Sequence, residues 1–193
     1  PQMNVAAQPA VADSAADPLA LADAALASVD AALSQAKAAL RARVAKGDRI
    51  SNTALEGEQY AAHALAWCAT YAESLREMAD WARRLQAEGK FGEMESLIFR
   101  IGFGEYLAQL RGGLPMSQTE MVRLAELGVS LEGDMVDALI AEGCSDAARK
   151  RLVELMVERD GAATFGECGL EEEFEMIREQ FRRFSDDKVV PHA

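Results

Sequence analysis

The segment FGEMESLIFRIGFGEYLAQL, residues 91–110, is the most apolar of the helices that the sequence predicts. Its hydrophobic residues point to several sides of a helix: Leu97, Ile98, Phe99, Ile101, Phe103, Tyr106, Leu107 and Leu110. A helix that is apolar nearly all round lies at the centre of its bundle. The segment therefore predicts a helical bundle built around residues 91–110.

Two glycines interrupt this helix, at Gly102 and Gly104. Each costs about 1 kcal/mol of helix propensity relative to alanine. They are explained if another helix passes close at that point. Gly102-Phe103-Gly104 could also be the start of a phosphate-binding loop, but it has no preceding strand, no third glycine and no following lysine. Close helix packing is the favoured interpretation.

Upstream, residues 1–17 lack hydrophobic periodicity and predict a disordered tail. Asp17 then predicts an N-cap with Pro18 at the first helical position, and Gly47 a stop. Apolar residues spaced three and four apart form a seam: Leu19, Ala22, Leu26, Val29, Leu33, Ala36, Leu40 and Val44. Its flanks carry few opposite charges, so a bundle helix is favoured over a dimeric coiled coil.

The next predicted helix runs from a capping box at Thr53–Glu56 to about Ala87, with Gly89 behind it. Its expected inner face is rich in aromatic residues: Tyr60, His63 or Ala64, Trp67, Tyr71, Leu75, Met78, Trp81 or Ala82, and Leu85. Such a stripe is typical of core packing rather than of a cofactor site. His63 has no second ligand at a suitable spacing on its own face, so a packed or capping histidine is favoured over a metal ligand.

Residues 112–115, GGLP, predict the end of the central helix. A second capping box, Ser117–Glu120, predicts a short helix through Leu127, ended by Gly128. A helix at about 131–141 follows, and then one at 146–158 with Ser145 as its cap. Leu152, Leu155 and Met156 are expected to face inward. Residues 161–169 predict a linker, so the bundle is expected to cover residues 18–160.

The last stretch, residues 170–193, reads LEEEFEMIREQFRRFSDDKVVPHA. Steps of four and three residues separate its apolar positions and predict one narrow apolar helix face: Leu170, Phe174, Ile177, Phe181 and Phe184. Three glutamates begin the helix, where its dipole favours negative charge, and Pro191 stops it. We expect this helix to open a second domain that continues beyond Ala193 and covers the apolar face.

The composition is that of a soluble globular protein of 193 residues, 50% hydrophobic and 27% charged, with a net charge of −12. The acidic balance argues against nucleic-acid binding, which needs clustered Lys and Arg. No membrane span or secretory signal is expected, and a cytoplasmic location is favoured. Cys68, Cys144 and Cys168 are odd in number and widely spaced, as reduced structural thiols would be.

Convergent groups that could make an active site are not evident in the sequence. The carboxylates Glu73, Glu77 and Asp80 fall on a predicted solvent face of their helix. No Cys/His pair, GxSxG or HExxH motif occurs. The sequence therefore assigns no catalytic, cofactor-binding or metal-binding residue, and predicts an all-α fold of five to six bundle helices plus the opening helix of a second domain.

Residues 171–193 resemble the first helix in the N-terminal helical domain of the acyl-CoA dehydrogenase family, with an acidic start, spaced phenylalanines and arginines, and a valine-proline stop. Two upstream segments, 62–85 and 91–124, resemble the long N-terminal extension of one subfamily. That subfamily oxidises (2S)-methylsuccinyl-CoA to mesaconyl-CoA and is associated with the ethylmalonyl-CoA pathway. The resemblance covers about residues 52–193.

This resemblance implies that the full-length protein binds FAD, desaturates an acyl-CoA thioester and passes electrons to electron-transferring flavoprotein. The family's catalytic glutamate and flavin contacts lie after the part of the family that this chain matches, so no such residue is carried over. The segment is then expected to be a structural bundle that makes oligomer contacts and is inactive alone, and the enzyme is expected to be a homo-oligomer. The alternative is a self-contained helical interaction module without enzymatic activity.

Overall fold

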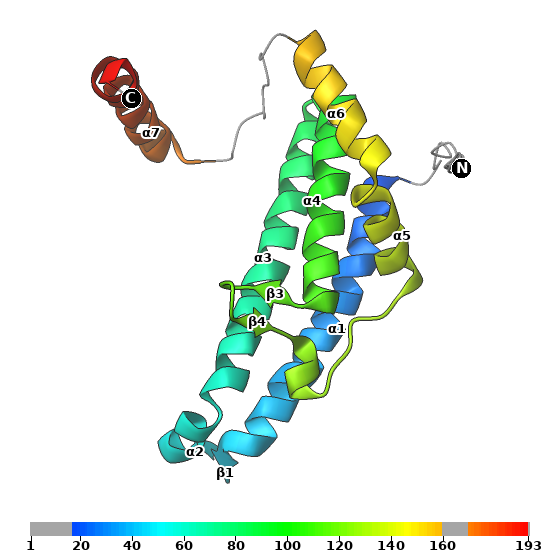
Figure 1. Ribbon diagram of the computed structural model, residues 1–193, viewed down its shortest axis with the longest axis vertical. Helices are drawn as coiled ribbons and strands as arrows, with labels where there is room; N and C mark the ends of the chain where they lie inside the picture. Colours follow the sequence, from blue (N-terminus) through cyan, green and yellow to red (C-terminus); the bar gives the residue numbers. More distant parts are fainter. Residues whose placement is uncertain (1–16, 160–169, 193) are drawn as a thin grey trace, which may run out of the picture. The chain divides into compact units, whose positions relative to one another are not determined.

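The computed structural model describes residues 17–159 and 170–192, and the chain divides into two compact units, Pro1–Ala162 and Ala163–Ala193. The described residues form seven α-helices, six in the first unit and one in the second (Figure 1). They are α1 (Pro18–Val44), α2 (Asn52–Gly57), α3 (Gln59–Ala87), α4 (Glu93–Gly112), α5 (Asp134–Gly143), α6 (Asp146–Glu158) and α7 (Glu172–Phe184). The all-α prediction is confirmed.

Helix α4 is central to the first unit, as the apolar segment 91–110 predicts. It packs against α1, α3, α5 and α6 (Figure 1). Phe99 and Phe103 are completely buried, with ring centroids 4.6 Å apart. Fully burying a phenylalanine stabilises a fold by about 1.5–3 kcal/mol, so this pair anchors the core.

The glycines of α4 mark close contacts with neighbouring helices. A methyl group on Gly104 would lie 2.8 Å from the Cα of Gly143 and from the carbonyl oxygen of Leu139, both in α5. On Gly102 it would meet the Met78 side chain of α3 at 2.7 Å. Close packing thus explains both glycines. Neither is open to a phosphate group.

Helix α1 begins as predicted: Pro18 is its first residue, and the backbone N–H of Leu19 donates to Asp17 Oδ1 at 3.0 Å. The buried residues of α1 differ from the predicted seam at two positions: Ala25 and Ala32 are buried where Leu26 and Leu33 were expected. Those leucines lie at the edge of the core. By length and composition α1 alone among the described helices could span a membrane, but its inner side lies in the bundle core.

The inner face predicted for α3 is right at Ala64, Leu75, Ala82 and Leu85, and wrong by one residue at Tyr60, Trp67, Tyr71 and Met78. Tyr60 and Trp67 are 47% and 37% exposed. The buried line consists mainly of small residues: Ala61, Ala64, Cys68, Ala72, Leu75, Ala79, Ala82 and Leu85. Since α1 also buries alanines, the two long helices pack through small side chains. The bulkier aromatic residues are displaced to the flank, where the Tyr60 hydroxyl donates to the carbonyl oxygen of Met121 at 2.6 Å.

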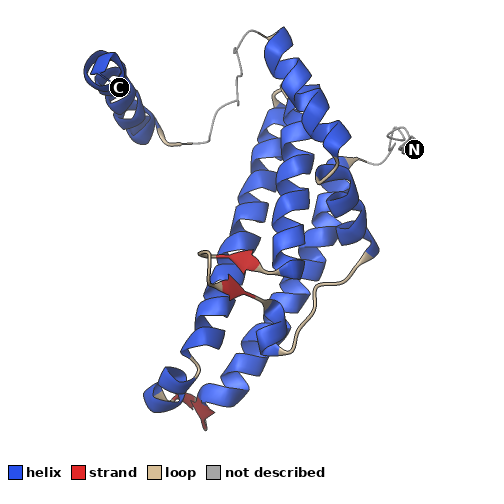
Figure 2. Ribbon diagram, viewed as in Figure 1, coloured by secondary structure: helices blue, strands red, loops and turns tan. Residues whose placement is uncertain are grey.

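The connection between α1 and α3 differs from the prediction in three ways. Gly47 does not cap α1; it lies with φ +63° in the turn between β1 (Ala45–Lys46) and β2 (Arg49–Ile50) (Figure 2). The cap of the next helix is Ser51, whose Oγ accepts from the N–H of Ala54, rather than Thr53. The predicted single helix is interrupted at Glu58, which separates α2 from α3. The predicted end is right, because α3 stops at Ala87 before Gly89 at φ +67°.

Residues 117–127 do not form the predicted capped α-helix. Residues 117–120 instead turn between β3 (Leu114–Pro115) and β4 (Met121–Val122), and only Leu124–Leu127 is helical, as a 3-10 turn (Figure 2). The carboxylate of Glu120 approaches His63, so it is not available to cap its own chain. Gly128 does end the segment, in a left-handed conformation at φ +72°.

The last two helices of the first unit agree more closely with the sequence. Helix α5 starts a few residues later than predicted, after Gly133. Helix α6 has the predicted bounds, and Ser145 Oγ accepts from the N–H of Ala148 at 3.2 Å. Of the three residues expected to face inward, only Leu155 is buried, while Met156 is 46% exposed. The inner side of α6 is therefore narrower than predicted.

The second unit contains α7, a π-helical turn (Ser185–Val189) and a 3-10 turn (Val190–His192). The apolar line predicted along α7 is exposed, between 42% at Ile177 and 71% at Phe181. The predicted tail and linker lie almost wholly outside the described residues. The domain limits at 18–160 and 170–193 therefore remain predictions.

Candidate interaction surfaces

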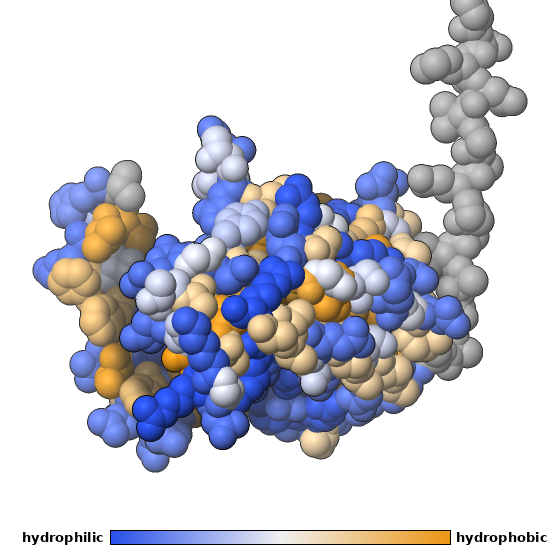
Figure 3. All heavy atoms as spheres, turned by 90° about the horizontal axis from the view of Figure 1, so that it is seen from below, coloured by the Kyte–Doolittle hydropathy of each residue, from blue (hydrophilic) through white to orange (hydrophobic). Residues whose placement is uncertain are grey.

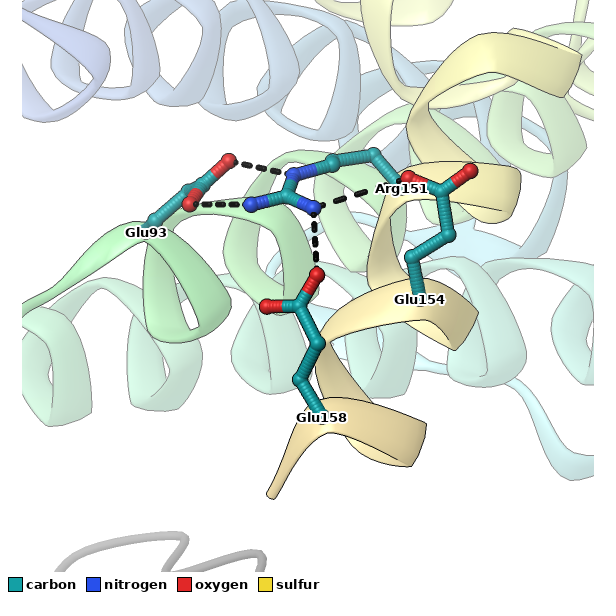
Figure 4. A network of polar contacts seen from close by, with 4 residues as sticks. All are labelled: Glu93, Arg151, Glu154 and Glu158. Carbon is teal, nitrogen blue, oxygen red and sulfur yellow. Dashed lines mark hydrogen bonds and ion pairs between the residues drawn. The ribbon is translucent and has the colours of Figure 1, made fainter.

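Helix α6 is attached to α4 by an arginine clamp. Arg151 binds Glu93 through two parallel hydrogen bonds, Nε to Oε1 at 2.8 Å and Nη2 to Oε2 at 3.0 Å (Figure 4). Its Nη1 donates to Glu158 at 3.2 Å and to Glu154 at 3.5 Å. Bidentate arginine–carboxylate pairs have the strongest geometry among ion pairs. The hydrogen bond from Arg151 holds the pKa of Glu93 below its ordinary value.

Two further arginines join the same helices. Arg149 forms an ion pair with Glu105 and donates to the carbonyl oxygen of Cys144 at 2.7 Å. At the other end of α6, Arg159 approaches Glu95 at 3.5 Å. Glu95 is only 5% exposed and also accepts from the N–H of Gly92 at 3.1 Å, at the start of α4. Polar contacts are thus prominent in holding α6.

The sequence prediction missed these pairs, although a signal for two of them exists. Arg149 and Arg159 are ten residues apart, as are Glu95 and Glu105. When two neighbouring helices run antiparallel, equal spacing lets both arginines of one helix reach both glutamates of the other. Without the knowledge that α4 and α6 are neighbours, the same charges look like a solvated surface.

The outer side of α6 is apolar and exposed. Val153, Met156 and Val157 are 58%, 46% and 75% exposed. By contrast, charged and polar side chains cover most of the end of the first unit that carries α2 and β1, with smaller apolar patches between them (Figure 3). The outer side of α6 and the apolar line of α7 are therefore candidate packing surfaces.

His63 bridges two elements rather than lying in the core. Its Nε2 is 3.2 Å from Glu120 Oε1, and its ring meets Trp67 edge-on with centroids 6.2 Å apart. This contact ties α3 to the turn between β3 and β4. Among residues 17–159 and 170–192, no three His, Cys, Asp or Glu side chains gather as a metal site would require.

The described thiols lie in packed surroundings. Cys68 is completely buried, and burial raises the pKa of its thiol to about 11. The pKa of the half-buried Cys144 is raised too, first by burial and then by the nearby Glu105. A thiol with a raised pKa is a poor nucleophile, in keeping with the predicted structural role. Cys168 lies outside the described residues.

The one glycine pair that the sequence offered as a phosphate-binding motif does not fit the phosphate groups of FAD. The glycine pair at Gly102 and Gly104 was the nearest approach to a phosphate-binding motif in the sequence, and it lies within a helix against Met78 and Gly143. A phosphate cradle needs unpaired backbone N–H groups, as at a helix N-terminus. No step of flavin chemistry can be derived from these residues.

The fold and its surfaces define a helical bundle followed by an amphipathic helix with an exposed apolar face. No protein-family model matches the chain. The chain is homologous to a (2S)-methylsuccinyl-CoA dehydrogenase from Cereibacter sphaeroides, to which it is 57% identical over 179 residues, or 92% of its length. It spans about a third of that relative. The predicted resemblance is confirmed.

Proposed function

We propose that the chain is part of an FAD-dependent acyl-CoA dehydrogenase that oxidises (2S)-methylsuccinyl-CoA to mesaconyl-CoA. The observation that carries the proposal is the 57% identity over 92% of the chain. Identity at this level over a whole bundle argues for a shared role, because unrelated bundles share only their hydrophobic pattern. The family resemblance of residues 171–193 supports the same proposal.

Within this enzyme, the first unit is a structural bundle. Several of its charged side chains make contacts between helices, such as Arg151 with Glu93 and Arg100 with Glu142. Its exposed apolar residues suit packing against protein. In this proposal the groups that hold FAD and the acyl-CoA lie in the two thirds of the enzyme that the chain does not span. FAD accepts the hydride when bound, and electron-transferring flavoprotein receives the electrons.

The test is made on the full-length enzyme. It should be yellow when purified, and should reduce electron-transferring flavoprotein with (2S)-methylsuccinyl-CoA faster than with straight-chain acyl-CoAs of similar length. A colourless folded protein without turnover would refute the proposal and favour a self-contained interaction module. A yellow enzyme that prefers another acyl-CoA would retain the family and refute the substrate.

The role of the bundle needs a separate experiment. Removing residues 1–169 from the full-length enzyme should change its oligomeric state or lower its solubility, because apolar surface that the bundle covers becomes exposed. The readouts are sedimentation velocity and the unfolding temperature. If assembly, stability and turnover all stay unchanged, the bundle has no structural role.

A further inference from the structure

The outer side of α6 carries an apolar strip whose two ends have opposite charge. Val153 and Val157 form its middle and are the most exposed large hydrophobic side chains among residues 17–159. Lys150 lies one turn before Val153, toward the start of the helix. Glu154 and Glu158 follow toward its end, on the same flank as Lys150 given 3.6 residues per turn. We call these five residues the α6 strip.

The charges of the α6 strip are arranged so that the strip complements itself. Lys150 is exposed and forms no ion pair with any residue of the described chain. When two copies of a helix pack antiparallel about a two-fold axis, a given flank of one copy faces the same flank of the other. The two flanks run in opposite directions, so the start of one lies beside the end of the other. Lys150 of each copy then approaches Glu158 of the other, and the valines of both copies meet between these pairs. Glu154 meets its own counterpart at the axis, where the Arg151 of each chain, 3.5 Å away, offsets part of its charge.

We propose that the α6 strip is a homotypic contact, in which α6 packs antiparallel against α6 of a second copy of this chain. Self-complementarity is what a two-fold interface requires. Asp146, one turn before Lys150, lies beyond the end of the opposing helix in this arrangement. The inference does not depend on the enzymatic activity proposed above.

Arg151 fixes the orientation of the strip. Because both carboxylate oxygens of Glu93 accept from one edge of this arginine, Nε and Nη2, α6 cannot rotate about its axis without breaking the pair (Figure 4). Glu154 and Glu158 also accept from Arg151, at 3.5 and 3.2 Å, which positions both carboxylates on the charged flank. The strip is therefore preorganised for a partner.

Sedimentation velocity of the full chain over a range of concentrations tests the proposal. The wild-type chain should show a concentration-dependent monomer–dimer equilibrium. Val157→Asp, which places a carboxylate in the apolar middle, should raise the dimer dissociation constant by about tenfold or more. Ile50→Asp is the matched control, since Ile50 is also an exposed aliphatic residue, at 44%, but lies far from α6 in sequence and fold. A wild-type chain that is monomeric throughout, or equal effects of both variants, would overturn the proposal.

Charge reversal tests the antiparallel direction. Lys150→Glu and Glu158→Lys should each raise the dissociation constant by up to about tenfold at low salt, because two ion pairs become repulsive. The double variant should recover most of the wild-type affinity. Failure to recover would rule out this pairing. Circular dichroism of each variant shows whether α6 stays folded, and a Val157→Asp chain that unfolds at lower temperature instead of dissociating would show that the strip is covered within its own chain.

Cross-linking gives an independent measurement. With Cys144 and Cys168 changed to serine, Val153→Cys should be joined to a second copy by a short bifunctional maleimide, since the strip middles face each other. Lys37→Cys, on the exposed side of α1, is the control and should not cross-link. If both variants cross-link equally, the contact is not specific to α6.

Discussion

Gly143 lies where the last turn of α5 meets the backbone of α4. A methyl group at this position would come within 2.1 Å of the carbonyl oxygen of Arg100, and Gly104 faces it across the same contact. A flexible side chain could move out of the way, but a helix backbone cannot. The two glycines therefore set the distance between α4 and α5, the most extensive helix pairing in the bundle.

Replacing Gly143 with alanine should therefore destabilise the first unit strongly. We expect a loss of about 2–4 kcal/mol in the free energy of unfolding, measured by urea denaturation, because two backbones must move apart. Gly112→Ala is the control, since nothing lies within 4 Å of a methyl group there, and its effect should be within about 0.5 kcal/mol of zero. Similar effects of the two changes would mean that α4 and α5 are not in close contact.

Cys68 should be chemically inert in the folded chain. Burial raises its pKa to about 11, so almost no thiolate exists at pH 8. Iodoacetamide at pH 8 should therefore leave Cys68 unmodified in peptide mapping by mass spectrometry, and modify it fully in urea. Because its pKa is higher in the folded chain than in the unfolded chain, the thiol contributes stability below about pH 9, which is lost as the pH rises toward 11. Rapid labelling in native buffer would contradict its burial.

At the scale of single elements, α6 is attached by the arginine clamp as well as by hydrophobic contact, since Leu155 is its one buried residue. Arg151→Ala should speed amide hydrogen exchange along α6 while α3 and α4 stay protected. Arg83→Ala, which breaks a similar exposed contact between α3 and α1, should leave exchange in α6 unchanged. Equal exchange in wild type and Arg151→Ala would show that the clamp does not hold the helix.

The same clamp predicts a pH dependence. Arg151 lowers the pKa of Glu93, so the contact contributes stability above the ordinary glutamate pKa, and this stability is lost as the pH falls below it toward the lowered value. Exchange in α6, corrected for its intrinsic pH dependence, should be unchanged between pH 7 and 5 and faster at pH 3. Glu93→Gln should reduce this difference, and the remainder comes from Glu95 and Glu105, which also pair with arginines of this segment. A pH effect as large in the variant as in the wild type would have another origin.

The sequence predicted those elements whose signals are local. Asp17 and Ser145 cap their helices as expected, because an N-cap contact spans only two or three residues. The prediction failed where a residue distant in the sequence determines the local structure. The Ser117–Glu120 motif matches a capping box, yet Glu120 lies against His63, and the hairpin of β3 and β4 forms instead. A motif cannot show which of two partners a carboxylate will meet.

The aromatic positions predicted on the inner face of α3 were wrong for a related reason. Large aromatic residues were expected inside because they bury the most area. Packing between α1 and α3 selects small residues, so Ala72 and Ala79 are buried while Trp67 is partly exposed. Helix periodicity allows two neighbouring sets of inward-facing residues in α3, one shifted by one position from the other. Only contact with the partner helix determines which set is buried. No residue of the candidate surfaces on α6 could be chosen without knowing that α4 covers its other side.

At the scale of the whole molecule, the exposed apolar line of α7 is the feature that a further domain would cover. A 13-residue helix with its apolar face exposed is marginal in water. If the line packs against a second domain, the first unit should not depend on it. Phe181→Ser in the 193-residue chain should then leave the unfolding of the bundle unchanged, whereas Phe99→Ala should cost about 3–5 kcal/mol as a core cavity forms. Urea denaturation followed by circular dichroism measures both.

The full-length enzyme should respond differently to Phe181→Ser. There the line would be buried, so a hydroxyl in place of the phenyl ring should lower the unfolding temperature of the second domain. The comparison shows whether the apolar face of α7 is covered by a second domain or by the bundle, because the two proteins differ only in length. If Phe181→Ser destabilises the 193-residue chain as much as the longer one, α7 packs on the bundle itself. The expected domain start at residue 170 would then be wrong, and α7 would be a further helix of the first domain.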